Sequence, residues 1–346
     1  MARKKAKTMK AMQVPAPGTP FEMVEREIPL PGPYEVLIKI AACGICHSDA
    51  FVREGGWPGI AYPRVPGHEV TGAVEDVGDA VVSWAIGDLV GVGWHGGHCF
   101  VCDRCRAGDF VTCRNALVSG ISTDGGYAEY MVARQEAVAA VPDGLDLVEA
   151  APLLCAGLTT FNALRNSGAR GGDVVAVQGL GGLGHLAVQF ATKLGFHTVA
   201  ISRGQEKELL ARELGAKDYI DSEHEVVAEE LQKLGGARVI LATAPSGRSI
   251  TTLINGLGVG GRLVVVGAEG TPIEVSPLQL IGARRALSGW PSGQPSDSED
   301  TLEFSALTGA KAMIERFPLA EAEKAYQRML HNEVRFRAVL DMATSG

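Results

Sequence analysis

The sequence predicts an α/β protein in two parts, an all-β, barrel-like region followed by a doubly wound parallel sheet. Up to about residue 140, short β-branched runs are separated by Gly and Pro, which is typical of a barrel. From Gly172 onward, apolar strands alternate with amphipathic helices, which is typical of a parallel sheet. A glycine-rich turn over residues 179–184 joins the first of these strands to a helix. The length of 346 residues fits two domains of about 150 residues each.

The barrel-like region is expected to form its strands in four runs, YEVLIKIAAC (34–43), GAVEDVG (72–78), GDLVGVGW (87–94) and YAEYMVA (127–133). In the second region a continuous apolar strand, Asp173–Gln178, precedes the glycine turn. Apolar residues then recur at helical spacing from Leu183 to Leu194. The alternation continues with strands at Thr198–Ser202, Tyr219–Ile220, Val239–Ala242, Arg262–Gly267 and Ala286–Gly289, and with helices at Lys207–Leu214 and Val226–Leu234.

The end of the sequence is less decisive. Ser292–Asp300 (SGQPSDSED) is polar and predicts a turn-rich boundary. A run at Arg316–Leu319, a helix at Ala320–His331 and a strand at Ala338–Asp341 follow. These elements could close the parallel sheet or return to the N-terminal region, and periodicity does not decide between the two.

Charge and hydropathy exclude several classes of function. With 32 basic and 40 acidic side chains the net charge is −8, which argues against nucleic-acid binding because phosphate neutralisation needs clustered Lys and Arg. The one basic run, Arg3–Lys7, is interpreted as a solvated tail. No apolar stretch reaches the length of about 18 residues that a membrane span needs, and no signal-peptide core follows Met1. We therefore expect a soluble, cytoplasmic protein that uses no membrane.

The seven cysteines all precede Ala156, and their odd number argues against a disulfide framework. Four of them, Cys99, Cys102, Cys105 and Cys113, are close enough in sequence to bind one tetrahedral zinc ion. Such a four-thiolate site has no open position, so its expected role is to fold the lobe of residues 95–115. A reduced, metal-free loop is the alternative.

A second set, Cys46, His68 and Cys155, has the ligand types of a catalytic zinc that keeps one position open. The three residues lie far apart in sequence, so ligand type alone is weak evidence. Cys43 leaves two alternatives open. It could pair with Cys46 as a redox couple, or it could be a small buried residue beside the site.

The glycine-rich turn predicts a dinucleotide-binding site, because glycines let the backbone approach pyrophosphate at a helix N-terminus. Its residues are Gly179, Gly181, Gly182, Leu183 and Gly184. The alternative is that these glycines only pack helix on strand. At the tip of the next strand stand Ser202, Arg203 and, one helical turn on, Lys207, with no carboxylate. A hydroxyl and a guanidinium suit a 2′-phosphate, so NADP is favoured over NAD, unless Arg203 is a solvated loop charge.

In this order, the motifs CGICHSD, GHE, the four-cysteine lobe, PLLCAG and GLGGLG resemble those of zinc-dependent alcohol dehydrogenases of the medium-chain dehydrogenase/reductase (MDR) superfamily. The resemblance covers nearly the whole chain. It is greatest to the microbial, yeast-like branch and to cinnamyl-alcohol-type enzymes. It implies a GroES-like, partly open β-barrel catalytic domain of residues 1–153 and 294–346. A Rossmann domain of residues 154–293 would be inserted between them.

The resemblance also implies roles for single residues. Cys46, His68 and Cys155 would hold a catalytic zinc, which makes Cys43 a neighbour. Further roles fall on Asp49 (orienting His68), Glu69 (a carboxylate near the metal), Ser48 (receiving the substrate proton), His47 (contacting pyrophosphate), and Trp57 and Trp94 (lining the substrate pocket). Core packing is the alternative for both tryptophans, and Trp290 could approach the pocket mouth. Many relatives have a proton-relay His where this chain has Phe51.

The implied activity is reversible oxidation of a primary or secondary alcohol to its aldehyde or ketone with NAD(P). Two zinc ions per chain and a homo-oligomer, tetramer or dimer, are expected. Two alternatives stay open, a zinc-free quinone or enone reductase of the same superfamily, and a non-catalytic protein that binds zinc and nucleotide.

Overall fold

The computed structural model describes residues 7–267 and 270–344, so of the basic run only Lys7 lies among the described residues. The described chain divides into two compact units. Unit 1 contains the chain up to Cys155 and again from Ser292, and unit 2 is Ala156–Pro291. Each unit is described by itself.

Unit 1 is built on a seven-stranded, mostly antiparallel sheet among the described residues, with strand order β16-β17-β3-β4-β5-β9 and with β8 also paired to β3. These strands are β3 (Glu35–Gly44), β4 (Val70–Val77), β5 (Leu89–Val92), β8 (Tyr130–Arg134), β9 (Val138–Ala140), β16 (Ile314–Pro318) and β17 (Arg337–Asp341). Two two-stranded sheets accompany it among the described residues, β1 (Thr8–Gln13) with β2 (Glu22–Glu27) and β6 (His95–Gly97) with β7 (Leu117–Val118).

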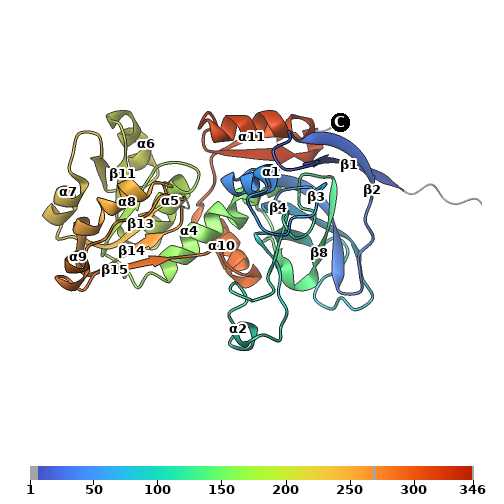
Figure 1. The fold of residues 1–346 in the computed structure, drawn as a ribbon, viewed down its shortest axis with the longest axis horizontal. Coiled ribbons are helices and arrows are strands. Elements are labelled where there is room, and N and C mark those ends of the chain that lie inside the picture. The colour runs from blue at the N-terminus through green and yellow to red at the C-terminus, as the bar shows by residue number, and fades with distance from the viewer. Residues whose placement is uncertain (1–6, 268–269, 345–346) are drawn as a thin grey trace, which may run out of the picture. The chain divides into compact units, whose positions relative to one another are not determined.

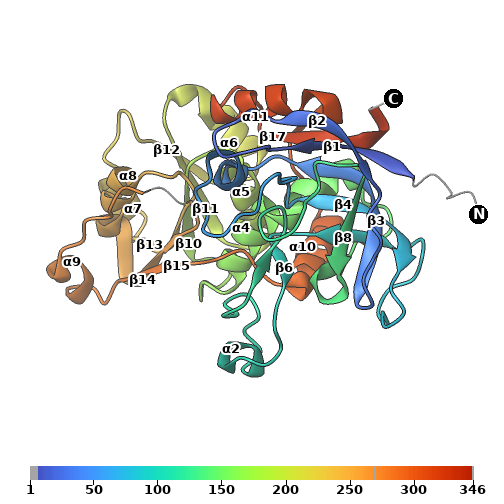
Figure 2. The same ribbon diagram turned by 45° about the vertical axis from the view of Figure 1, so that its right-hand side comes forward.

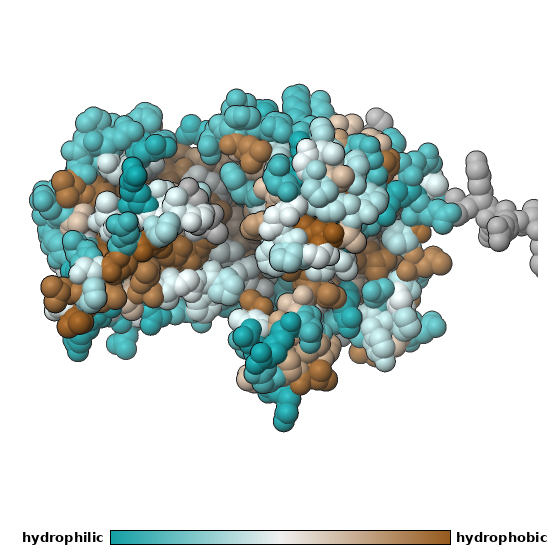
Figure 3. Space-filling model, viewed as in Figure 1, coloured by the Kyte–Doolittle hydropathy of each residue, from teal (hydrophilic) through white to brown (hydrophobic). Residues whose placement is uncertain are grey.

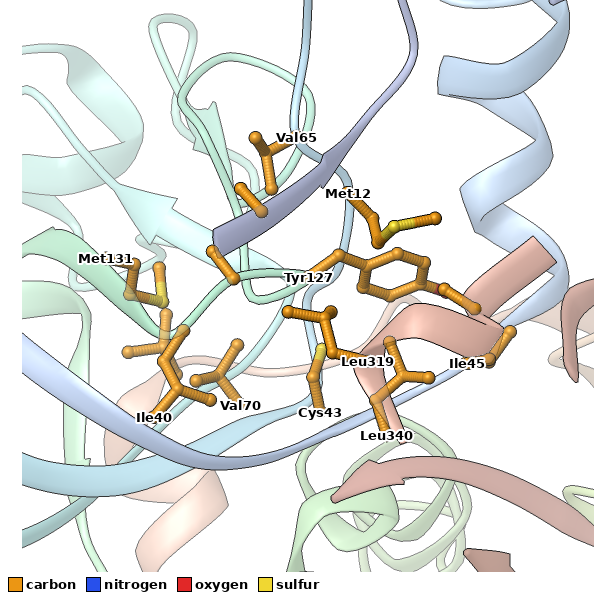
Figure 4. Packing of buried hydrophobic residues seen from close by; sticks show 14 of the residues in the cluster. Met12, Ile40, Cys43, Ile45, Val65, Val70, Tyr127, Met131, Leu319 and Leu340 are labelled. Carbon is orange, nitrogen blue, oxygen red and sulfur yellow. The ribbon is translucent and has the colours of Figure 1, made fainter. Parts of the chain in front are cut away.

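The core of unit 1 follows from strand alternation. Val36, Ile38 and Ile40 of β3 are two residues apart, so they point to the same face and join one buried cluster. Figure 4 shows the centre of this cluster, where Cys43 lies among apolar side chains that include Tyr127 and Leu340. Cys43 is fully buried there, which is the environment of a small core residue.

The C-terminal elements belong to unit 1, which settles the alternative left open by the sequence. β17 pairs antiparallel with β3, with Leu340 opposite Cys43, and β16 extends the sheet beyond it. Helix α11 (Ala322–Leu330) lies beside β1 and β2, and its Tyr326 is buried in the same core (Figure 2).

The prediction of a turn-rich boundary over Ser292–Asp300 is wrong from Pro295 onward, because α10 (Pro295–Thr308) begins there. The physical reason is a helix start in polar sequence. Pro295 is in the first turn, and the side chains of Gln294 and Asp297 form a reciprocal capping box. Unit 1 also contains the short helices α1 (Ala50–Glu54), α2 (Asp103–Arg106) and α3 (Leu147–Ala150).

Unit 2 is a doubly wound parallel sheet with strand order β12-β11-β10-β13-β14-β15 (Figure 1). Its strands are β10 (Val174–Gln178), β11 (His197–Ser202), β12 (Asp218–Asp221), β13 (Ala237–Ala242), β14 (Leu257–Val265) and β15 (Ala286–Gly289). Its helices are α4 (Ala156–Arg165), α5 (Gly184–Lys193), α6 (Glu208–Glu213), α7 (Val227–Lys233), α8 (Gly247–Thr251) and α9 (Pro277–Ile281). Strand order reverses between β10 and β13, the point at which such sheets bind ligands.

No single helix among the described residues is long and apolar enough to cross a membrane. One bent pair, Leu147–Leu154 with Ala156–Arg165, reaches that length and composition together, and its side chains are mostly buried in the protein.

Candidate active site

Residues from three parts of unit 1 meet at one point. Cys46 lies just before the short helix η1 (His47–Asp49), His68 lies just before β4, and Cys155 follows η3 (Ala151–Leu154). The sulfurs of Cys46 and Cys155 are 3.9 Å apart. Ligand atoms of these residues and of Glu69 all lie within 4.8 Å of one another. The fold therefore brings together the three residues that the sequence could not connect.

The His68 ring is oriented by Asp49. His68 Nδ1 is 3.3 Å from Asp49 Oδ1, while the other ring nitrogen, Nε2, is buried without a hydrogen-bond partner in the described protein. Asp49 Oδ2 accepts hydrogen bonds from the Cys46 backbone N–H and the Tyr127 hydroxyl, both at 2.9 Å. A buried nitrogen without a partner destabilises the fold unless something binds it. An unpaired imidazole nitrogen beside two sulfurs fits a zinc ion.

The electrostatics of the group also suit a cation. A hydrogen bond from the Cys155 thiol holds the pKa of Cys46 well below its ordinary value, although burial acts in the opposite direction. The same contact, together with burial, raises the pKa of Cys155. Burial disfavours protonated His68, but the charge and hydrogen bond of Asp49 raise its pKa above the usual value. A cation at this point would stabilise both sulfurs as thiolates.

Glu69 lies beside this group and is held by Arg337 of β17. Arg337 Nη2 donates to Glu69 Oε1 and, at 3.1 Å, to the Ile45 carbonyl, whereas Glu69 Oε2 is buried without a partner. Burial raises the pKa of Glu69 to about 7, although the charge of Arg337 acts in the opposite direction. A Cβ at Gly44 would lie 1.9 Å from Glu69 Oε2, so this carboxylate requires a glycine there.

A second sulfur group lies in the lobe around α2. The Cys99 sulfur is 3.6 Å from that of Cys113 and 4.0 Å from that of Cys105, and the sulfurs of Cys102 and Cys113 are 3.9 Å apart. The backbone N–H groups of Cys105 and Asn115 point at the Cys102 and Cys113 sulfurs. All four cysteines are free thiols. Four converging sulfurs that accept backbone N–H bonds fit a tetrahedral metal.

Aromatic rings lie beside the first group. Trp94 packs edge-to-face on the His68 ring at 4.9 Å between centroids, and Trp57 packs on Trp94 at 5.7 Å. Phe51 of α1 is a third ring, 5.5 Å from Trp57. Phe51 and Trp57 are each 37% exposed, so the cluster is not a closed core. On η1, Ser48 is half-buried and His47 is exposed.

Trp290 belongs to unit 2. It lines a cavity of about 480 Å³ with residues of β14 and β15, and its Nε1 has no hydrogen-bond partner among the described residues. The structure thus places it against its own sheet.

The glycine turn lies at the carboxyl end of β10. Gly179 has φ +97°, and a Cβ at Gly184 would lie 1.8 Å from the Gly179 carbonyl oxygen, so helix α5 approaches the strand closely. A Cβ at Gly181 would meet nothing within 4 Å. Leu183 caps α5, and Gly182 lies within the same turn. Gly179 and Gly184 are therefore required for packing, whereas Gly181 leaves free space beside the turn.

The next strand tip carries the residues proposed to choose the cofactor. Ser202 ends β11 and is buried, and Arg203 is exposed. Lys207 is the last residue of the short helix η4 (Gln205–Lys207). Its ammonium donates a hydrogen bond of 2.9 Å to the Arg203 carbonyl. The Glu206 carboxylate lies next to Gly204, a feature that the sequence prediction did not include.

Residues 32–143 match the family described as alcohol dehydrogenase GroES-like domain, and residues 182–307 match the zinc-binding dehydrogenase family. The chain is 46% identical to alcohol dehydrogenase notN from Aspergillus sp. (strain MF297-2) over 325 residues, which is 94% of this chain and 95% of that protein. The chain belongs to the zinc-type alcohol dehydrogenases of the MDR superfamily.

Solved structures agree with this alcohol dehydrogenase fold. A Sorghum bicolor cinnamyl alcohol dehydrogenase (SbCAD4) has a TM-score of 0.88 and 34% identity, covering 98% of this chain and 99% of its own. CAD from Helicobacter pylori, complexed with NADP(H), has a TM-score of 0.86 and 27% identity, covering 98% and 99%. This alcohol dehydrogenase is therefore an oxidoreductase acting on CH–OH groups, with zinc and a nicotinamide cofactor.

Arg337 is the residue of this site that sequence reasoning missed. It begins β17 (sequence RAVLD), a strand with a charged residue at each end, and its partner Glu69 is 268 residues away in sequence. A buried arginine in such a run is a weak signal by itself.

Proposed function

We propose that this alcohol dehydrogenase catalyses reversible hydride transfer from a primary or secondary alcohol to NAD(P), which gives the aldehyde or ketone and NAD(P)H, with a catalytic zinc held by Cys46, His68 and Cys155. The observation that carries the proposal is the unpaired, buried His68 Nε2 beside two sulfurs. Zinc, when bound, acts as a Lewis acid on the substrate oxygen. The domain limits 1–153 with 294–346, and 154–293, remain part of the proposal.

The protein's own residues take the other roles. Ser48 accepts the proton of the substrate hydroxyl, and the exposed His47 beside it on η1 connects that proton with solvent and contacts the cofactor pyrophosphate. Asp49 holds the His68 ring, which fixes its tautomer. Glu69 keeps a carboxylate at the metal. Phe51 is a ring with no proton to exchange, so the proton leaves through the cofactor ribose, His47 or water.

We assign a second, structural zinc to Cys99, Cys102, Cys105 and Cys113, giving two ions per chain. The test compares three substitutions. Cys46→Ser should reduce bound zinc from two ions to one and lower kcat by at least about 10³-fold, with the fold retained. Cys102→Ser should also cost one zinc ion but lower the melting temperature. Cys43→Ala, which removes a thiol outside both groups, serves as the control and should keep both ions.

A chain that binds no zinc yet oxidises alcohols, or a Cys46→Ser variant with undiminished activity, would refute the zinc assignment. A zinc-free quinone or enone reductase would give the first result. A non-catalytic zinc and nucleotide-binding protein would show two ions and no turnover with any alcohol or aldehyde.

We propose NADP as the preferred cofactor, bound by Gly179, Gly181, Gly182, Leu183 and Gly184 at the pyrophosphate and by Ser202, Arg203 and Lys207 at a 2′-phosphate. The exposed Arg203 supports this, as does the NADP(H) complex of the Helicobacter pylori relative. Arg203→Asp should lower the ratio of kcat/KM for NADP to that for NAD by about 100-fold. An unchanged ratio would contradict the assignment.

The substrates proposed are small to medium alcohols and aldehydes, with benzylic or cinnamyl compounds among them. Trp57, Trp94 and Phe51 support this class because three partly exposed rings beside the metal group favour a planar, apolar substrate. The Sorghum bicolor relative is named for cinnamyl alcohol. A cytoplasmic location is proposed because seven free thiols suit a reducing compartment.

We further propose a homo-oligomer, dimer or tetramer. β15 is an exposed edge strand, and next to it in sequence Leu278 and Ile281 of α9 are 80% and 72% exposed. Figure 3 shows a hydrophobic patch at α9. Exposed edges and apolar patches of this kind favour self-association. Light scattering should show an oligomer that Leu278→Glu with Ile281→Glu shifts toward monomer.

A further inference from the structure

The loop that carries Arg203 is anchored by the neighbouring strand β12. The Gly204 N–H donates to Asp221 Oδ1 at 2.9 Å, and the Tyr219 hydroxyl donates to the Gly204 carbonyl at 2.6 Å. The Ser222 N–H donates to the Ser202 carbonyl at 2.9 Å. Both residues that flank Arg203 are thus held by the carboxyl end of β12.

The backbone conformation of Gly204 allows its N–H to donate one of these bonds while its carbonyl accepts the other. Its φ is +85°, in the region that side chains disfavour. With Lys207 bonded to the Arg203 carbonyl at 2.9 Å, the Arg203 backbone is held on both sides while its side chain stays exposed. Hydrogen bonds from β12 therefore fix the backbone of this loop, and with it the direction in which the Arg203 side chain projects.

Asp221 is suited to be a permanent anchor. It is 2% exposed; Oδ1 also accepts the Glu223 N–H at 3.0 Å, and Oδ2 contacts His224 Nδ1 at 2.7 Å. The hydrogen bond with His224 lowers the pKa of Asp221, so this carboxylate stays ionised. Asp221, Glu223 and His224 have ligand-like spacing, but both Asp221 oxygens already have protein partners, so the group is a loop anchor rather than a metal site.

Tyr219 is suited to be a permanent donor. Burial raises its pKa to about 12, and the negative charge of Asp221 acts in the same direction. Its hydroxyl therefore remains protonated and keeps its bond to Gly204.

We propose that Tyr219 and Asp221 are positioning residues for cofactor selection, which fix the loop so that Arg203 meets the 2′-phosphate of NADP. Neither residue contacts the cofactor in this proposal. Selective recognition requires the recognising group to be held within about 0.5 Å by supporting bonds. The inference rests on the proposed NADP preference and extends it to two residues on another strand.

The test measures KM and kcat with NADP and with NAD for Tyr219→Phe, Asp221→Ala and Asp221→Asn. Tyr219→Phe and Asp221→Ala should each raise KM for NADP roughly five-fold, the effect of one lost hydrogen bond. KM for NAD and kcat should each change less than about two-fold, because NAD has no 2′-phosphate for Arg203 to bind and Arg203 takes no part in the reaction. Asp221→Asn keeps an acceptor oxygen for the Gly204 N–H and should restore most of the NADP affinity.

Binding of 2′,5′-ADP and 5′-AMP gives a second readout that does not need turnover. Only 2′,5′-ADP carries the 2′-phosphate, so only its dissociation constant should rise in Tyr219→Phe and Asp221→Ala. The matched control is Asp218→Asn, at the opposite end of β12, where the carboxylate pairs with His197 and not with the loop.

Three results would separate the possible failures. Equal weakening of both cofactors and both nucleotides, with a lower melting temperature, would mean a purely structural role and overturn the inference. If Arg203→Asp lowers the NADP/NAD ratio but Tyr219→Phe and Asp221→Ala do not, the inference alone fails. If Arg203→Asp leaves the ratio unchanged, the proposed NADP preference fails first.

Discussion

At the scale of single residues, Asp49 determines most of the geometry of the candidate metal centre. One carboxylate contacts the His68 ring, the Cys46 backbone and the Tyr127 hydroxyl. Its three partners come from distant parts of unit 1. Two of these partners belong to the proposed zinc ligands His68 and Cys46. A substitution of Asp49 should therefore affect metal binding without removing a ligand.

Asp49→Asn should weaken binding of the catalytic zinc about 10- to 100-fold, the range found when a partner behind a metal-bound His is altered. An amide can replace one acceptor oxygen but not two. The measurement is zinc retention against a chelator, with kcat followed in parallel. Asp88→Asn is the control and should retain zinc like the unaltered protein, because within the described residues this carboxylate bonds only the Ala85 N–H of a turn. Equal retention in both variants would contradict the role of Asp49.

His95 should make stability dependent on pH. Burial lowers its pKa to about 4, and the positive charge of His98 acts in the same direction. Because this lies below the unfolded value of about 6.5, the unfolded chain binds more protons. The contribution of neutral His95 to the free energy of unfolding is therefore fully present above about pH 6.5 and is lost as the pH falls toward 4.

Between pH 7 and pH 5.5, His95 should reduce the free energy of unfolding by about 1 kcal/mol. His95→Gln should show a correspondingly shallower decline in urea unfolding experiments, since Gln does not titrate. His331→Gln, at an exposed position, should follow the unaltered protein. Parallel curves for all three proteins would show that His95 titrates normally.

Residue type predicted the side chains that meet at the site, because few groups bind zinc and they stand in recognisable motifs. It could not show that Glu69 is paired with Arg337, since the two are distant in sequence and arginines are usually exposed. Nor could it show that Phe51 joins the two tryptophans. Both contacts depend on the tertiary packing of α1 and β17, which the local sequence does not show.

At the scale of elements, the regular strands of unit 2 were predictable because an apolar run with turn residues on either side leaves little choice. β10, β11 and β15 lie within about one residue of their predicted limits. The helices α8 and α9 were not predicted. Each has five residues, too few to show a periodic apolar face, and their N-terminal serines Ser246 and Ser276 were the available signals.

The glycine turn gives an element-scale prediction, because its glycines have different surroundings. Gly184→Ala should destabilise unit 2, since a Cβ would lie 1.8 Å from the Gly179 carbonyl oxygen. Gly181→Ala should leave the melting temperature unchanged, since a Cβ there meets nothing within 4 Å. If the turn holds pyrophosphate, Gly181→Ala should instead raise KM for NADP and NAD equally, about ten-fold or more.

Thermal unfolding and steady-state kinetics of the two alanine variants check this. An unaffected KM in Gly181→Ala would mean that the turn only packs helix on strand. A stable Gly184→Ala variant would show that α5 can move away from β10.

At the scale of the whole molecule, unit 1 is made from two distant stretches of the chain. The sequence did not decide where the C-terminal elements lie, because strand pairing between β17 and β3 is a long-range contact that local patterns do not encode. The pairing also brings Arg337 to Glu69. The candidate metal centre is therefore complete only when both stretches are present.

A chain ending at Gly309 should lose the tertiary structure of unit 1 but keep that of unit 2. The shortened chain lacks β17, the strand that lies between β16 and β3. It also lacks buried core residues such as Tyr326 and Leu340. Hydrogen exchange should show rapid exchange in β3 and β4 and continued protection in β10 and β13. A chain ending at Thr344 is the control. Alcohol oxidation by the shorter chain would contradict the dependence of the metal centre on β17.

The position of β17 sets an order of events during synthesis. Ribosomes release a protein from its N-terminus, so the parallel sheet of unit 2 can fold while β17 is still inside the exit tunnel. The strand that carries Arg337 emerges after Cys46, His68 and Cys155, because it follows them in the chain. Completion of the proposed metal centre is thus a late step, and until then its thiols lack the protection that a bound ion would give.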